Sequence, residues 1–405
     1  MHRWLSILMV AVGAFGISAC SGGGNGNPFN GDGGVDPLEC EDFATPPPGC
    51  DEPCPSGDLD CQDGTFCFNG VCSAQCTAEE GCGEGFECNS RGRCGLILGG
   101  TGGTGGTGTC NPPPVTTSRI IPNVMFLVDQ SGSMTEDFGG GQNRWEAAHS
   151  AITSVVSELD SIVRFGLTTY QSADGGSVPD ECPIFDTQVS IALNNFSAIN
   201  MSFPASFPGG EDTPTGESIT ELVKDLDAAN LPTDGPTIIV LATDGEPDTC
   251  AVPDPQNGQA ESVTAATAAH AAGYDIFVLS VGDDVGQAHL QDMANVGTGL
   301  AEDGSEGDAT FWVATDPDSL EAAFNEIIGA NISCEVKFDK AIANRQRACD
   351  EGEITLDGVL LDCPTEWNLQ DGSNDTIVLL GAACDAWKAG GVTLTAEFPC
   401  GVVVE

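Results

Sequence analysis

Residues 124–133 read VMFLVDQSGS, five consecutive apolar residues followed at once by a short polar segment. An uninterrupted apolar run of this length predicts a strand buried on both faces, as in a parallel sheet covered by helices. Residues 238–242 (IIVLA) and 276–279 (IFVL) have the same character. The chain therefore contains several strands of one buried sheet.

Helical patterns alternate with these strands. Apolar residues keep helical spacing over 145–159 and 219–226, and Asp316-Pro317 supplies an N-cap and a first-turn proline for a further helix. Residues 189–193 alternate apolar and polar side chains, which suits an edge strand. This order predicts a doubly wound, mostly parallel α/β domain of Rossmann-like type over residues 118–330.

Polar side chains follow the predicted strands where ligands bind in such sheets, beyond the carboxyl ends. Two carboxylates and three hydroxyls stand in three loops that should meet at one edge: Asp129, Ser131, Ser133, Thr213 and Asp244. All are oxygen donors, so the expected ion is a hard divalent cation, Mg²⁺ first and Mn²⁺ or Ca²⁺ as alternatives. The competing interpretation is that the aspartates cap loops and the serines form turns.

The pattern Asp129-x-Ser131-x-Ser133, followed in order by Thr213 and Asp244, resembles the metal-ion-dependent adhesion site (MIDAS) of von Willebrand factor type A (VWA) domains. The resemblance covers about residues 118–330. It implies that both serines bind the metal directly, that Asp129 binds it directly or through water, and that Thr213 and Asp244 join according to ligand state. It also implies that an open coordination position accepts a carboxylate from a protein partner, as in adhesion or protein–protein interaction.

The first nineteen residues have the features of a signal peptide, with Arg3 before an apolar stretch too short to span a membrane. They lead into Ile17-Ser18-Ala19-Cys20, which resembles the lipobox of bacterial lipoproteins and implies acylation of Cys20. Ser21 after the cysteine resembles the outer-membrane sorting class, so we expect a lipid-anchored protein of the bacterial outer membrane or cell envelope, periplasmic or surface-exposed. An ordinary secretory signal with a chance cysteine is the alternative.

Without Cys20, eighteen cysteines remain, ten in 40–94 and eight in 110–400, and each even block can pair internally. Residues 20–39 suit a flexible tether and 99–117 a Gly/Thr-Pro linker. Residues 40–98 resemble small EGF-like or Dickkopf-like disulfide modules; a zinc site is the alternative, although paired Cys-x2-Cys spacing is lacking. Residues 331–405 suggest a small disulfide-bonded β domain.

Four cysteines around the α/β domain are disulfide candidates. Cys182 and Cys250 fall on loops at the metal edge and are expected to pair, which would stiffen that face. Cys110 and Cys334 flank the domain, whose termini should be neighbours, and their pairing is one choice among several.

The charge balance excludes several partners. There are 12 Lys and Arg against 61 Asp and Glu, a net charge of −49, which argues against nucleic acid and against a basic membrane-docking face. His149 and His270 fall in helix-like segments, and HExxH, GxSxG and Walker motifs are missing from the sequence. We therefore expect a binding protein, not an enzyme. A passive structural envelope protein and a metal-dependent hydrolase with Glu246 or Asp248 as base are the alternatives.

Overall fold

The computed structural model describes residues 43, 45–54, 61–62, 64–68, 71–74, 76–77, 86–88, 94–96, 114–172, 182–252 and 256–404. The chain divides into two compact units, Met1–Cys110 and Asn111–Glu405. The signal peptide, Cys20, the tether and Cys110 lie outside the described residues. Among the helices that are described, none has the length and apolar character needed to cross a membrane.

The described residues of the first unit include two short hairpins. β1 (Phe66–Phe68) pairs with β2 (Val71–Ser73), and β3 (Phe86–Cys88) pairs with β4 (Cys94–Leu96), both antiparallel. The sulfurs of Cys54, Cys61 and Cys72 lie close enough to hold a metal. However, Cys61 is bonded to Cys72, and Cys54 is also disulfide-bonded. Thiolates are what zinc requires, so this cluster favours the disulfide interpretation over the zinc one.

The second unit is built on a six-stranded sheet in the order β11-β10-β9-β6-β7-β8. Its strands are β6 (Asn123–Asp129), β7 (Arg164–Tyr170), β8 (Gln188–Ala192), β9 (Thr237–Thr243), β10 (Tyr274–Val281) and β11 (Trp312–Ala314). All neighbours are parallel except β8, which runs antiparallel to β7 at the edge. The predicted doubly wound, mostly parallel sheet is confirmed.

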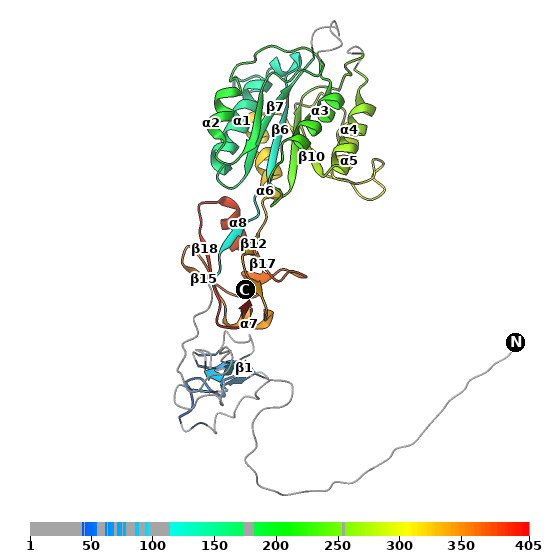
Figure 1. Ribbon diagram of the computed structural model, residues 1–405. Coiled ribbons are helices and arrows are strands. Elements are labelled where there is room, and N and C mark those ends of the chain that lie inside the picture. Colours follow the sequence, from blue (N-terminus) through cyan, green and yellow to red (C-terminus); the bar gives the residue numbers. More distant parts are fainter. Residues whose placement is uncertain are drawn as a thin grey trace, which may run out of the picture. The chain divides into compact units, whose positions relative to one another are not determined.

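Helices cover both faces of this sheet (Figure 1). They are α1 (Arg144–Leu159), α2 (Phe196–Ser202), α3 (Thr215–Ala228), α4 (Gln259–Ala271), α5 (Gln287–Gly297) and α6 (Pro317–Asn331), with a 3-10 turn, η3 (Gly132–Thr135), after β6. Phe126 and Val128 of β6 pack in one core with α1, α2 and α6, whereas Met125 and Leu127 pack in the other with α3, α4 and α5. This explains the uninterrupted apolar run, because successive side chains enter opposite cores.

The rest of the second unit is a small, mainly β part with its own core. Its elements are β12 (Glu335–Phe338), β13 (Ala341–Ile342), α7 (Arg345–Glu351), β14 (Glu353–Leu356), β15 (Val359–Leu361), β16 (Trp367–Leu369), β17 (Thr376–Leu379), α8 (Gly381–Ala389), β18 (Leu394–Glu397) and β19 (Val403–Val404). The helices α7 and α8 were not expected from the sequence. One sheet, in the order β16-β17-β12-β5, also takes in β5 (Thr117–Arg119), so the start of the predicted 118–330 range belongs to this part.

Disulfides hold this part together. Cys349 is bonded to Cys363 and Cys334 to Cys384. The suggested Cys110–Cys334 bridge is therefore wrong. Cys334 directly precedes β12, and α8 packs beside the neighbouring strand β17, which brings the Cα atoms of Cys334 and Cys384 to 5.2 Å.

Candidate metal centre

Asp129 is fixed where β6 ends. Its side chain is completely buried. Its Oδ1 accepts a hydrogen bond from the backbone N–H of Ser131 at 2.8 Å, and its Oδ2 accepts one from the Thr243 hydroxyl at 2.7 Å. Thr243 is the last residue of the neighbouring strand β9, so the two strand ends hold this carboxylate in one orientation.

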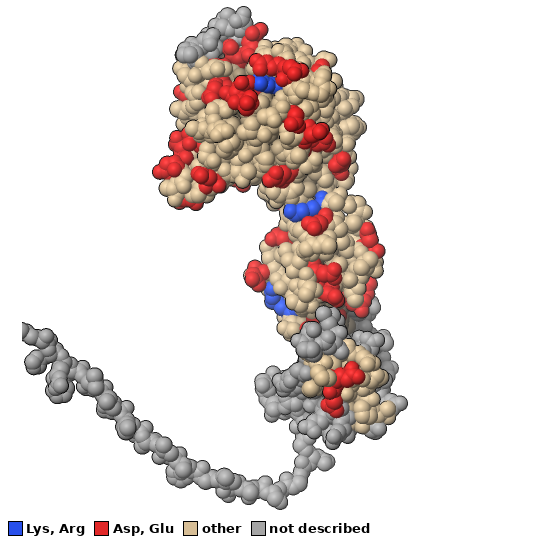
Figure 2. All heavy atoms as spheres, turned by 180° about the vertical axis from the view of Figure 1, so that it is seen from behind, with Lys and Arg blue, Asp and Glu red and all other residues tan. Residues whose placement is uncertain are grey.

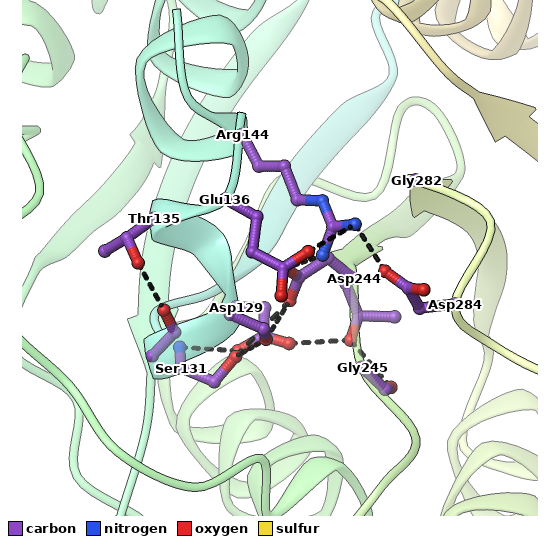
Figure 3. Close-up of polar contacts among 12 residues, drawn as sticks. Asp129, Ser131, Thr135, Glu136, Arg144, Asp244, Gly245, Gly282 and Asp284 are labelled. Atoms are coloured by element: carbon purple, nitrogen blue, oxygen red, sulfur yellow. Dashed lines mark hydrogen bonds and ion pairs between the residues drawn. The ribbon is translucent and has the colours of Figure 1, made fainter. Parts of the chain in front are cut away.

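Asp244 follows β9 and is also completely buried. Its Oδ1 accepts hydrogen bonds from the hydroxyls of Ser133 at 2.8 Å and Ser131 at 3.3 Å, and these two hydroxyls lie 3.0 Å apart. Its Oδ2 accepts a hydrogen bond from Arg144 Nη1 at 2.8 Å (Figure 3). Both serines therefore direct their hydroxyls to the same oxygen.

Thr213 completes the set just before α3. Thr213 is 2 % exposed. Its hydroxyl lies near Gly245, the residue after Asp244. A Cβ placed on Gly245 would lie 3.5 Å from Thr213 Oγ1 and 3.7 Å from Ser133 Oγ. The hydroxyls of Thr213 and Ser133 therefore both lie next to Gly245, which has no side chain to separate them. All five predicted residues come to the same edge of the sheet.

Two buried carboxylates at one place are electrostatically unfavourable. Burial raises the pKa of Asp129, and the charge of Asp244 raises it further. Burial also raises the pKa of Asp244, against the opposing effect of the hydrogen bond from Arg144. A cation at this edge would relieve the repulsion, and the donors are all oxygens, so the residues fit a hard divalent ion.

Arg144 is the residue that the sequence reasoning missed. It is the first residue of α1, after the N-cap Asn143, and its side chain is 7 % exposed. Besides Asp244, its guanidinium pairs with Glu136 at 3.1 Å and with Asp284. The only sequence signal was a rare basic residue soon after the Asp129-x-Ser131-x-Ser133 loop.

A disulfide joins Cys182, which precedes β8, to Cys250 in the loop after β9, the pair expected from the sequence. It is reinforced by Glu217 of α3, whose Oε1 accepts a hydrogen bond from the backbone N–H of Cys250 at 2.9 Å. The loop after β9 is therefore attached both to the chain before β8 and to α3.

The residues considered for catalysis have structural contacts. Glu246 accepts hydrogen bonds from the Gly286 backbone and the Gln259 side chain, and Asp248 accepts one from the Thr213 backbone. The His149 ring packs against Phe203, and His270 pairs with Asp275 at 2.7 Å. These contacts account for the positions of all four side chains.

The α/β domain matches a known family. The model of the von Willebrand factor type A domain matches residues 123–326. Inter-alpha-trypsin inhibitor heavy chain H4 of Bos taurus is 29 % identical over 192 residues, 46 % of this chain and 19 % of that protein, so the chain spans about a fifth of its relative.

Solved structures to which the chain is similar include a pilus adhesin and a manganese-loaded protein. The pilus adhesin SpaC of Lactobacillus rhamnosus GG is 16 % identical, with 67 % of this chain and 41 % of that chain covered and a TM-score of 0.40. The manganese-loaded TRAP protein of Plasmodium vivax is 12 % identical, with 66 % and 96 % covered and a TM-score of 0.38.

Proposed function

This chain belongs to the von Willebrand factor type A domain family, and on that basis we propose that it binds a protein partner through a divalent cation at a MIDAS-type site. The observation that carries the proposal is the convergence of Asp129, Asp244 and three hydroxyls at one strand edge. Two buried carboxylates at one site repel each other unless a cation or a proton compensates their charge, and Arg144 pairs with Asp244 but not with Asp129.

Each ligand residue has a distinct part. Asp129, held by Ser131 and Thr243, offers a fixed carboxylate, and Ser131, Ser133 and Thr213 offer neutral oxygens. When bound, the cation supplies an electrophilic centre. Because three of the donors are neutral, that centre keeps charge enough to attract a carboxylate from the partner. Mg²⁺ is the expected ion, with Mn²⁺ or Ca²⁺ as alternatives.

We further propose that the domain is displayed from a bacterial outer membrane or cell envelope. The support is the apolar stretch that ends in Ile17-Ser18-Ala19-Cys20 and the even blocks of cysteines beyond it. Figure 2 shows Asp and Glu side chains spread over the face in view, with few Lys or Arg among them. Such a surface repels acidic partners over about a Debye length, ~8 Å at physiological salt, so surroundings rich in salt or divalent cations suit it.

A calorimetric titration of Mg²⁺ and Mn²⁺ into the chain beginning at Ser21 tests the proposal. We expect one ion per chain in the wild type and loss of binding in Asp129→Ala. Asp234→Ala is the matched control, because this aspartate pairs with Arg164, at the opposite end of the sheet. Equal binding by wild type and Asp129→Ala would overturn the metal site. Capture of partners from envelope extract, with and without EDTA, then tests whether the ion is required.

A further inference from the structure

Arg144 holds a fixed position against the candidate metal centre. Nη1 donates to Asp244 Oδ2, and Nη2 pairs with Glu136 and Asp284. Gly282 lets the guanidinium lie against the backbone, since a Cβ at that position would come within 2.9 Å of Nη2. The backbone φ of Gly282 is +116°, which also favours glycine.

The three carboxylates around Arg144 are of two kinds. Asp244 is fully buried and belongs to the predicted ligand set, whereas the side chains of Glu136 and Asp284 are 58 % and 57 % exposed. An ion pair with an exposed partner adds little stability, because water solvates the carboxylate when the pair opens. Glu136 and Asp284 can therefore each leave Nη2, whereas Asp244 stays; Glu136 is the one that belongs to the loop of Ser131 and Ser133.

Asp244 lies between two positive positions. Its Oδ1 faces the serine hydroxyls, where the cation is proposed, and its Oδ2 faces Arg144. Figure 3 shows the Glu136 carboxylate directed toward Arg144 and Asp244. Glu136 follows η3, in the loop that also carries Ser131 and Ser133. A carboxylate of the chain itself thus pairs with Arg144 Nη2, while Nη1 of the same guanidinium binds Asp244.

We propose that Arg144 binds anions at this site in addition to the cation, and that the preferred ligand carries two neighbouring acidic groups. This rests on the proposed function: one acidic group binds the cation, and the other replaces Glu136 at Arg144 Nη2. A guanidinium keeps its charge at any physiological pH and binds carboxylates through parallel N–H donors, which suits this role. Glu136 then acts as a built-in competitor that less acidic ligands fail to displace.

The test uses two dipeptides blocked at both ends, Asp-Asp and Asp-Ala, titrated by NMR into the chain beginning at Ser21 with saturating Mg²⁺. Wild type should bind Asp-Asp more tightly than Asp-Ala. Glu136→Gln should tighten Asp-Asp binding about two- to fivefold, because the ligand no longer has to break the exposed ion pair between Glu136 and Arg144. Arg144→Met should weaken it about tenfold or more, to the Asp-Ala level, because a charge-assisted hydrogen bond is lost.

Arg164→Met is the matched control. Arg164 is the first residue of β7, its side chain is only 12 % exposed, and it also pairs with an aspartate, Asp234. Arg164→Met should leave both affinities unchanged. Equal binding of the two dipeptides by Mg²⁺-loaded wild type would overturn the role of Arg144, as would unchanged Asp-Asp binding in Glu136→Gln. That second outcome decides the matter even if Arg144→Met does not fold.

A separate Mg²⁺ titration of every variant distinguishes the two proposals. If wild type binds Mg²⁺ but shows no dipeptide preference, only the role of Arg144 is wrong. If wild type binds no Mg²⁺, the proposed function fails, and the two-acid ligand fails with it.

Discussion

Thr213 and Asp248 bind each other reciprocally. The backbone N–H of Thr213 donates to Asp248 Oδ2 at 3.1 Å, and the backbone N–H of Asp248 donates to the Thr213 carbonyl at 2.9 Å. Asp248 is 3 % exposed, so water competes little for these bonds. The loop after β9 and the loop before α3 therefore form one unit, which sets the place of Thr213 relative to Asp244.

Replacing Asp248 with alanine should weaken metal binding although Asp248 is not a predicted ligand. Thr213 would lose the carboxylate that fixes its backbone, and we expect Mg²⁺ affinity to fall about tenfold, as for other residues that orient ligands. Asp248→Asn, which keeps an acceptor oxygen, should lose less. Calorimetric titration measures both, and wild-type affinity in Asp248→Ala would show that the reciprocal bonds do not matter for the metal.

Ser131→Ala should reduce Mg²⁺ affinity less than Asp129→Ala does. The Ser131 hydroxyl is neutral, and a water molecule can take its place beside Ser133 and Asp244. We expect a loss on the order of tenfold, against a much larger loss when a charged ligand is removed. Thermal melts in EDTA should show both variants folded, because apolar strands hold the sheet. A greater loss in Ser131→Ala than in Asp129→Ala would contradict this order.

Removing the Cys182–Cys250 disulfide should lower stability without unfolding the sheet. The bond joins residues 68 apart, and for that loop length the chain-entropy model gives about 4 kcal/mol. The double variant Cys182→Ser/Cys250→Ser should therefore unfold at lower denaturant concentration and bind Mg²⁺ somewhat more weakly. The double variant Cys349→Ser/Cys363→Ser is the control, since that bond lies in the β part; it should leave Mg²⁺ binding unchanged.

The large sheet could be predicted from the sequence because burial on both faces makes each strand an uninterrupted apolar run, which is visible in a few consecutive residues. Residues 124–128 enter opposite cores alternately, so every one of them is apolar. The candidate ligands follow from a related pattern: polar residues directly after buried strands fall at the carboxyl edge of the sheet. Whether they bind a metal stays a prediction.

The features that the sequence did not predict depend on contacts between distant residues. Arg144 lies 100 positions from Asp244, and only the path of the loop before α1 brings them together. The three polar residues of β5 carry no strand pattern, and their pairing with β12 spans more than 200 positions. Similarly, even cysteine counts allow complete pairing within each block, but they do not predict that Cys334 pairs with Cys384.

Cys20 should carry a lipid that holds the protein in the membrane fraction. The prediction depends on Ile17-Ser18-Ala19-Cys20 and on acylation, which adds about 0.8 kcal/mol of membrane affinity per buried CH₂. Cys20→Ala should move the protein into the aqueous phase on detergent partitioning, and mass spectrometry should find acyl chains on wild-type Cys20. If Cys20→Ala stays as membrane-bound as wild type, the anchor is elsewhere.

The stability of the metal-free domain should fall as pH rises, because Asp129 and Asp244 are buried together. In the folded protein, burial and the charge of Asp244 raise the pKa of Asp129 to about 7, whereas an unfolded aspartate titrates near ~3.9. A raised pKa means that the folded state holds the proton more tightly. The resulting stabilisation is complete below about pH 4 and is lost as pH rises through about 7.

Denaturant unfolding in EDTA between pH 5 and pH 8 measures this effect, and Asp129→Asn isolates it from the other carboxylates of the chain. Wild type should lose on the order of 1–3 kcal/mol more than Asp129→Asn across that range. Mg²⁺ at pH 8 should restore the stability of wild type, because the cation replaces the proton as the compensating charge, and should leave Asp129→Asn nearly unchanged. Parallel pH profiles for the two proteins would mean that Asp129 keeps an ordinary pKa and that the two buried carboxylates do not repel each other.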